Sequence, residues 1–104
     1  MAYTMVILAE PRIARFDFPN DARPNNRVSV ICSTTSGSTP LQFEWMKNGL
    51  PLVKSETINI GSNEDASTLT FRQLKREDAG NYTCIVRNKE GMDAFTASLK
   101  MKSE

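Results

Sequence analysis

The chain has 104 residues, a length typical of one domain, and its 13 Lys and Arg against 12 Asp and Glu give a net charge of +1. So small a net charge provides no strong field for nucleic acid or an anionic membrane, and we expect neither as a partner. The chain has no histidine and only two cysteines, so it lacks the commonest general base and cannot complete a four-ligand zinc site. We therefore expect no enzyme, no catalytic residue, no metal and no cofactor.

The longest apolar run near the N-terminus, residues 5–9, is far shorter than the roughly 20 residues of a membrane helix. It is also too short for the apolar core of a secretory signal. We expect one domain over residues 1–104, ordered from about residue 5 to residue 102, with any signal and membrane segment lying outside these residues.

Short segments in which apolar and polar residues alternate follow one another along the chain. After a first strand that carries Phe16 and Phe18, of which at least one should be buried, they comprise residues 28–33, 41–46, 58–60, 69–71, 82–86 and 95–101. Turns are expected at 36–40, at Asn48-Gly49, at 61–65 and at 88–91, with one short helical turn within 73–79. A period of two is typical of strands with one buried face, so the sequence predicts an all-β, two-sheet antiparallel sandwich.

Two cysteines are the centre of a spaced pattern within these strands. Cys32 and Cys84 are 52 residues apart, and Trp45 and Tyr82 lie between them. By strand parity both cysteines and Trp45 face inward, where an indole would fill the space beside a bridge between two sheets. The residues alone leave a structural disulfide or two buried thiols of a cytosolic domain as alternatives, and the inward parity favours the disulfide.

Cys32, Trp45 and the stretch Asp-Ala-Gly-Asn-Tyr-Thr-Cys at 78–84 together resemble the immunoglobulin superfamily over nearly the whole chain. The short connection from Trp45 to Leu69 is similar to that of the I-set type. The resemblance implies an immunoglobulin-like Greek key with one disulfide between the sheets, and it implies structural roles for the following residues: Cys32, Trp45, Leu69, Asp78, Tyr82 and Cys84. Many such domains pair the aspartate with an arginine; here only Lys54 is basic near that place, so the partner of Asp78 is left open.

Three shorter stretches, residues 11–18, 28–33 and 95–99, resemble the variable domains of the invertebrate Dscam (Down syndrome cell adhesion molecule) family. That resemblance implies an extracellular module of a single-pass cell-surface receptor with neighbouring domains. It also implies homophilic recognition between cells through antiparallel matching of such domains. The corresponding hypothesis is that this domain binds a second copy of itself.

Strand parity separates two outer surfaces on which a partner could bind. On one sheet the outward residues, apart from Arg72 at the edge, are predicted to be uncharged: Ser29, Ile31, Thr57, Asn59, Thr68 and Thr70. On the other they mix both signs of charge with two apolar residues: Gln42, Glu44, Met46, Thr83, Ile85 and Arg87. A surface that meets its own copy about a two-fold axis must be self-complementary, so the uncharged set is the predicted homophilic interface and the charged set is the alternative.

Asn81-Tyr82-Thr83 matches the acceptor pattern for N-glycosylation, although it could equally be the start of a strand whose tyrosine the fold requires. An occupied Asn81 would place a sugar on the outer side of the sheet that carries Glu44 and Arg87. The mixed charges of residues 72–78 are expected to form a solvated turn.

Two alternatives to homophilic recognition belong to other functional classes. The domain could be a structural I-set module of a cytoskeletal giant protein, which predicts reduced cysteines and no glycan. It could also be a heterophilic immune-receptor domain, which predicts a binding site on the loops near residues 36–40 and 88–92.

Overall fold

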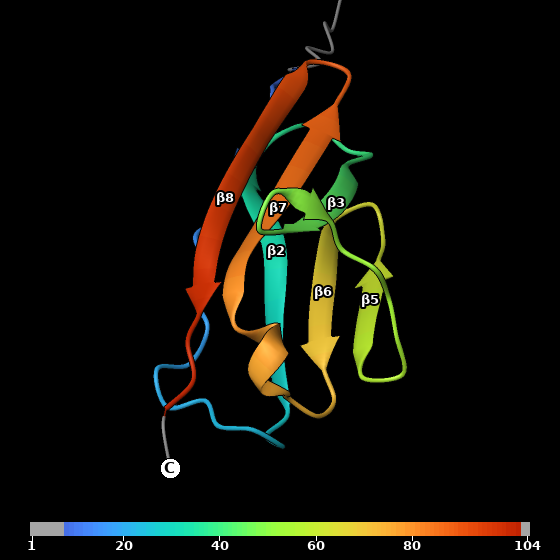
Figure 1. Ribbon diagram of the computed structural model, residues 1–104. Helices are drawn as coiled ribbons and strands as arrows, with labels where there is room; N and C mark the ends of the chain where they lie inside the picture. Colours follow the sequence, from blue (N-terminus) through green and yellow to red (C-terminus); the bar gives the residue numbers. More distant parts are fainter. Residues whose placement is uncertain (1–7, 103–104) are drawn as a thin grey trace, which may run out of the picture.

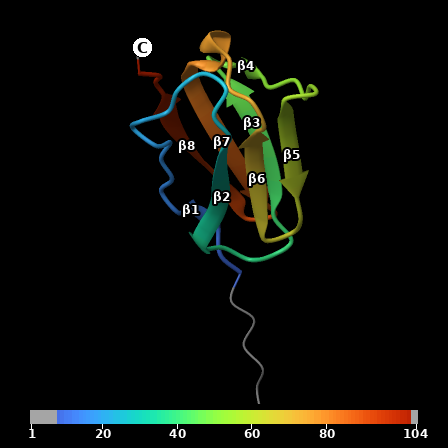
Figure 2. The ribbon, with the colours of Figure 1, turned by 90° about the horizontal axis from the view of Figure 1, so that it is seen from below.

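The computed structural model describes residues 8–102, so the predicted order of residues 5–7 lies outside the described residues. This described part of the chain forms eight strands and one short 3₁₀ helix, in chain order β1 (Arg12–Ile13), β2 (Val28–Ser36), β3 (Gln42–Lys47), β4 (Leu50–Pro51), β5 (Ile58–Ser62), β6 (Ala66–Phe71), η1 (Arg76–Asp78), β7 (Gly80–Asn88) and β8 (Gly91–Leu99) (Figure 1). The predicted two-sheet antiparallel sandwich is confirmed. One sheet has the order β1-β2-β6-β5 and the other β4-β3-β7-β8, and Figure 2 shows them as two layers.

The alternation of apolar and polar residues places one side of each sheet in the core. In residues 28–33 of β2 and throughout β6 the residues switch between buried and more exposed at every step, with Val30 opposite Leu69 and Cys32 opposite Ser67. In the other sheet Trp45 lies opposite Cys84. Because side chains of a strand point alternately to its two faces, these registers direct the apolar set of both sheets toward one shared interior.

A disulfide between Cys32 and Cys84 joins the two sheets, with their Cα atoms 6.4 Å apart, as predicted. Trp45 is buried beside it, and Leu69 and Tyr82 have no exposed surface. The rings of Phe71 and Tyr82 meet edge to face with centroids 5.3 Å apart, a favoured geometry for aromatic pairs. The core is therefore a covalent link surrounded by closely packed rings.

Three local features differ in extent from the sequence prediction. Phe16 and Phe18 are both buried, but the strand predicted to carry them is limited to Arg12–Ile13. The helical turn expected within 73–79 is the single turn Arg76–Asp78. The Asn48-Gly49 pair forms the expected turn, with φ of 49° and 83°, the left-handed values that a two-residue type I′ hairpin requires. This turn leads into β4, a two-residue strand that the sequence alternation did not indicate.

The first and last described residues lie at opposite ends of the sandwich (Figure 1). At the entry end, the Asn88 side chain donates hydrogen bonds from Nδ2 to the carbonyl oxygens of Ala9 and Ser38, at 2.7 and 3.1 Å. At the exit end, the backbone N–H of Lys102 donates to the carbonyl oxygen of Ala22 at 2.9 Å. Within residues 8–102, no helix has the length and apolar character needed to cross a membrane.

Candidate interaction surface

A buried hydroxyl fixes the inner side of the β1-β2-β6-β5 sheet to the opposite sheet. Trp45 donates a hydrogen bond from Nε1 to Oγ of Ser67 at 2.8 Å, and Ser67 Oγ lies 2.7 Å from Oγ of Ser62. Sequence reasoning did not single out Ser67. Its signal was the inward parity of a polar residue on a strand that faces a tryptophan, because a buried indole N–H needs an acceptor.

The inner side of the other sheet is fixed at the turn before β7. The Tyr82 hydroxyl donates to the backbone carbonyl oxygen of Asp78 at 2.5 Å. Asp78 is buried, and its Oδ2 accepts a hydrogen bond from the backbone N–H of Lys75 at 2.8 Å. The partner of Asp78, which the sequence left open, is therefore the backbone N–H of Lys75. Burial raises the pKa of Tyr82 above its ordinary value of 10.0, and the negative charge of Asp78 adds to the rise.

The predicted interface residues lie on the outer side of the β1-β2-β6-β5 sheet, which we call the uncharged face: Ser29 and Ile31 on β2, Thr68 and Thr70 on β6, Asn59 on β5, and Thr57 in the bend before β5. Ile31 is 56% exposed, an unusual value for an isoleucine within a sheet. Thr57 lies directly before β5 and continues its pairing with β6. Its carbonyl oxygen accepts the backbone N–H of Arg72 at 2.7 Å.

Strand pairing arranges the uncharged face in two rows that cross the sheet. In the first, which we call the Ser29 row, Ser29 lies opposite Thr70, and Thr70 lies opposite Asn59. In the second, the Ile31 row, Ile31 lies opposite Thr68, and Thr68 lies opposite Gly61. Ser29 Oγ and Thr70 Oγ1 are 2.9 Å apart and hydrogen bonded.

The outer side of the β4-β3-β7-β8 sheet, which we call the opposite face, pairs its polar groups within itself. Arg87 donates to Glu44 at 3.0 Å across β3 and β7, and the hydroxyl oxygens of Thr83 and Thr96 are 2.7 Å apart across β7 and β8. Asn81 is exposed at the start of β7, and its Oδ1 accepts a hydrogen bond from Ser98 Oγ at 2.5 Å. Side chains of this face therefore satisfy one another.

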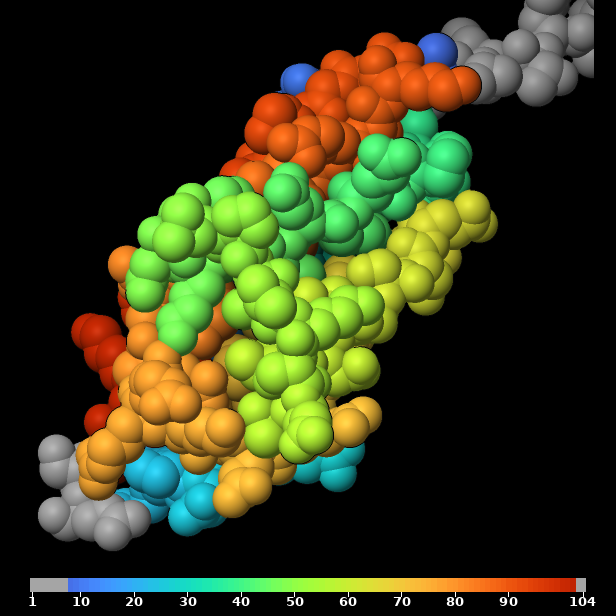
Figure 3. Space-filling model, turned by 45° about the vertical axis from the view of Figure 1, so that its right-hand side comes forward, coloured from blue at the N-terminus to red at the C-terminus, as the bar shows by residue number. Residues whose placement is uncertain are grey.

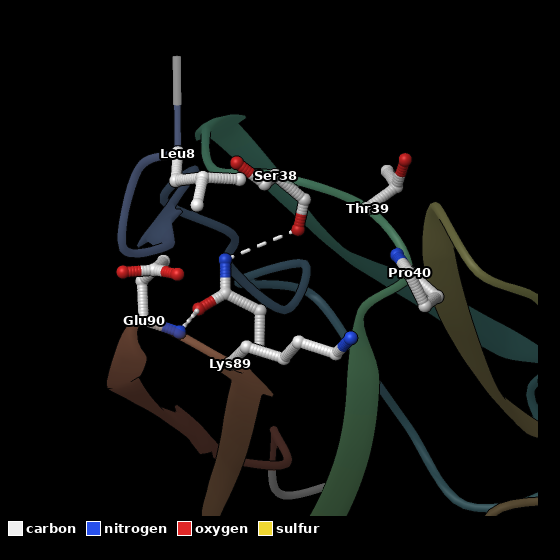
Figure 4. A pocket seen from close by; sticks show the side chains of 7 residues that line it. Leu8, Ser38, Thr39, Pro40, Lys89 and Glu90 are labelled. Atoms are coloured by element: carbon white, nitrogen blue, oxygen red, sulfur yellow. Dashed lines mark hydrogen bonds between the residues drawn. The ribbon is translucent and has the colours of Figure 1, made fainter. Parts of the chain in front are cut away.

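Two other surfaces come from loops. Residues 50–60 lead from β4 of one sheet to β5 of the other and expose Leu50 and Val53; Figure 3 shows this segment in green to yellow-green on the surface of the molecule. At the entry end the loops near residues 36–40 and 88–91 meet, as the heterophilic alternative requires. Leu8, Pro40, Lys89 and Glu90 are among the residues that line a pocket there (Figure 4). Within residues 8–102, no group of acidic or cysteine side chains could hold a metal ion.

Two sheets joined by a disulfide beside a tryptophan, with a tyrosine hydroxyl bound back to the preceding turn, define an immunoglobulin-type sandwich domain. The family model of the immunoglobulin I-set domain matches residues 11–101, and the chain belongs to this family. It is a family of non-catalytic adhesion domains, so the chain is not an enzyme.

Similar proteins include cell adhesion molecules. The chain is 33% identical over 85 residues to the cell adhesion molecule DSCAM of Rattus norvegicus, a match that covers 82% of this chain and 4% of that protein. It is 31% identical over 91 residues to hemicentin-1 of Homo sapiens, covering 86% of this chain and 2% of that protein. The crystal structure of the Dscam1 Ig7 domain, isoform 5, matches with a TM-score of 0.83 and 27% identity, covering 89% of this chain and 97% of that domain. The chain therefore spans only a few per cent of these full-length relatives.

Proposed function

We propose that the domain is an extracellular recognition module of a single-pass cell-adhesion receptor and binds a second copy of itself on an apposed cell. In this proposal the two copies meet antiparallel through the uncharged face, while neighbouring domains of the receptor extend on either side. The observation that carries the proposal is that the six predicted interface side chains share one face and none of them is charged. Relatives named as cell adhesion molecules support the functional class.

The chemistry of the uncharged face suits contact with itself. Two copies related by a two-fold axis place the same patch on both sides, so any charge near the axis would meet a like charge. Serine and threonine hydroxyls and the Asn59 amide can each donate and accept, and therefore they can pair with an identical group. On the opposite face, Glu44 and Arg87 already form an ion pair, so burial there would require their desolvation.

The size of the uncharged face implies a weak contact. Six residues of β6 extend over roughly 20 Å, and four strands are about 15 Å wide, a projected area of about 300 Å². Stable interfaces bury about 800 Å² on each partner. A contact of this kind would hold two cells together by avidity, because many receptors bind at once between two membranes.

The disulfide supports an extracellular location over the cytoskeletal alternative. Bridges such as Cys32–Cys84 form and persist in oxidising compartments and are rare in the cytosol. The cytoskeletal alternative instead requires two free thiols. Measuring the mass of the native protein before and after alkylation distinguishes the two, since only free thiols gain mass.

A glycan on Asn81 is a further part of this proposal. Asn81-Tyr82-Thr83 is the sole acceptor sequence in the 104 residues, and Asn81 is exposed on the opposite face. A sugar there would obstruct the opposite face and leave the uncharged face free for a partner. Secreted protein should lose mass on treatment with an N-glycosidase, whereas Asn81→Gln and Thr83→Ala should not. Thr83→Ser keeps the acceptor sequence and is the matched control; a secreted wild type without the glycan contradicts this part.

Sedimentation velocity of the 104-residue chain tests the proposed interface. We expect self-association at roughly hundreds of micromolar, and we expect Ile31→Asp to weaken it more than about tenfold, because each dimer would bury two added charges. Asn59→Lys should act in the same direction. Met92→Asp is the matched control: Met92 is 54% exposed, close to the 56% of Ile31, but it lies on the other sheet. A monomeric wild type, or equal effects of Ile31→Asp and Met92→Asp, contradicts the proposal.

The pocket at the entry end favours one second candidate function, heterophilic recognition through loops. Residues 36–40 and 88–91 meet there around the Asn88 side chain, which the homophilic proposal does not use. Lys89→Glu reverses a charge at the pocket, in the turn between β7 and β8 of the other sheet. Under the homophilic proposal this substitution leaves self-association unchanged, whereas a partner bound through the loops would be lost.

A further inference from the structure

We infer that two copies meet in one particular register, in which the Ser29 row of each copy lies on the Ile31 row of the other. This inference rests on the proposed self-binding through the uncharged face. It goes further by assigning which side chains meet across the interface.

The two rows have opposite profiles of side-chain size. In the Ser29 row the small side chain, Ser29, lies on β2 and the larger one, Asn59, on β5. In the Ile31 row the order is reversed, because the exposed Ile31 lies on β2 and Gly61, which has no side chain, lies on β5. Nothing lies within 4 Å of the position that a Cβ on Gly61 would occupy, so the surface has open space there.

Antiparallel symmetry brings these profiles together. A two-fold axis that lies between the two faces and runs perpendicular to the strands places each strand over its own copy in the reverse direction. When the axis passes midway between the rows, Ile31 faces Ser29 of the second copy and Thr68 faces Thr70. On β5, Asn59 faces the open space at Gly61 of the second copy. The two largest side chains, Ile31 and Asn59, thus each meet a smaller residue of the other copy, and the threonines of β6 meet each other.

Neighbouring registers lack this fit. With the axis over the Ile31 row, Ile31 meets Ile31 while the open spaces at Gly61 face each other and remain unfilled, so contacts are lost there. With the axis over the Ser29 row, Asn59 meets Asn59, and the two larger side chains compete for the same volume. Only the register between the rows fills both positions.

The same register also suits the end of β6. Arg72 follows the last residue of this strand and is exposed, so it is the charged residue nearest to the rows along β6. In the register between the rows, Arg72 lies over Ala66 at the beginning of β6 in the second copy. The two copies of Arg72 therefore lie at opposite ends of the interface, and their like charges stay apart.

Filling the open space on β5 tests the register. We expect Gly61→Asn to weaken self-association at least about tenfold, because two asparagines would then meet at both symmetry-related positions. The substitution should leave the fold intact, since a Cβ at position 61 meets no neighbour and the backbone there is not left-handed. Circular dichroism and thermal unfolding of the variant check this point.

A swap of the two residues provides the decisive variant. The double substitution Asn59→Gly with Gly61→Asn exchanges the large and the small position, so that an asparagine again faces a glycine of the second copy. We expect the double variant to recover self-association to within about threefold of the wild type. The pair Ser29→Ile with Ile31→Ser repeats the test on β2: Ser29→Ile alone should weaken self-association, and the double substitution should restore it.

The outcomes separate the register from the function on which it depends. Loss in the single variants with recovery in both swaps supports the register. If the wild type associates and Ile31→Asp abolishes association, but Gly61→Asn has no effect or the swaps fail to recover it, the register is wrong and the uncharged face remains the interface. A wild type that stays monomeric overturns both.

Discussion

The outer sides of the two sheets differ in how far their polar side chains are hydrogen bonded to one another. On the opposite face, Glu44 binds Arg87, Thr83 pairs with Thr96, and Asn81 accepts from Ser98. On the uncharged face, Ser29 pairs with Thr70 across two strands, and Thr57 has only a long hydrogen bond of 3.4 Å to the neighbouring Ser55. The difference shows that polar side chains on a sheet do not by themselves identify an interface, because groups that already bind one another have fewer hydrogen bonds left for a partner.

The inner sides, in contrast, resemble each other. Each sheet contributes one buried polar anchor, Ser67 for the Trp45 indole on the first sheet and Tyr82 for the Asp78 carbonyl on the second. The Trp45–Ser67 hydrogen bond and the disulfide join the two sheets and keep the outer faces back to back, whereas the Tyr82 hydroxyl fixes the turn before β7. The contrast between the sheets therefore lies outside the core, and substitutions on each side can test it.

The largest effect is expected from removing the link between the sheets. Replacing both Cys32 and Cys84 by alanine should lower the free energy of unfolding by about 4 kcal/mol, because the unfolded chain regains the entropy of a loop closed over 52 residues. Urea denaturation measures the change, and the wild type under reducing conditions should behave alike. A loss below about 1 kcal/mol would show that packing alone holds the two faces back to back.

On the first sheet, the buried Ser67 hydroxyl should contribute more to the free energy of unfolding than the exposed Ser29 hydroxyl. Ser67→Ala leaves the Trp45 N–H buried without its acceptor, so the free energy of unfolding should fall by about 2 kcal/mol. Ser29→Ala, the matched control on the exposed side, should change it by less than about 0.5 kcal/mol. Chemical denaturation of the two variants provides the test. Equal losses in the free energy of unfolding would contradict a special stabilising role for the buried Ser67 hydroxyl.

The buried Tyr82 hydroxyl of the second sheet should make the stability of the domain depend on pH in alkaline solution. Because burial raises the pKa of Tyr82, the folded state keeps its proton above pH 10.0 while the unfolded chain loses it. Stability is thus fully present below this pH and falls above it, by up to about 1.4 kcal/mol for each pH unit. Tyr82→Phe should be less stable near neutrality by about 1 kcal/mol but show a shallower alkaline decline. Parallel declines of the two proteins would contradict a buried, protonated Tyr82.

The smallest effect is expected on the opposite face. A double-mutant cycle with Glu44→Gln and Arg87→Gln should give a coupling energy below about 1 kcal/mol that decreases with added salt, because both side chains are substantially exposed. The same variants should leave self-association unchanged. A loss of self-association in these variants would instead show that the opposite face is the interface, and it would contradict the proposed role of the uncharged face.

The core and the outward residues were predictable because both depend on strand parity. The period of two around Cys32 and Cys84 placed those residues inward, and the same count placed Ile31 and Thr70 outward. The family resemblance added the disulfide connection. Parity does not say where a strand begins, and Thr57 lies in the bend before β5.

Contacts that depend on tertiary placement were not predictable in this way. The Asp78 carboxylate binds a local backbone N–H, a choice that the sequence does not distinguish from a basic side chain such as Lys54. The two rows, and the open space at Gly61 beside Thr68, follow from the pairing of β2, β6 and β5, which no single strand specifies. Parity identifies a face, but only the register between strands arranges its side chains.

The position of the disulfide limits how far the domain can lengthen under a pulling force. The described chain enters at one end and leaves at the other, so tension between two cells would act along the strands. If the sheets separated, the segment between Cys32 and Cys84 would stay closed as a covalent loop, and about 180 Å of chain would be withheld from extension. Only the segments outside this loop could then extend, so the disulfide would remove about half of the chain from the length that a pulling force could draw out.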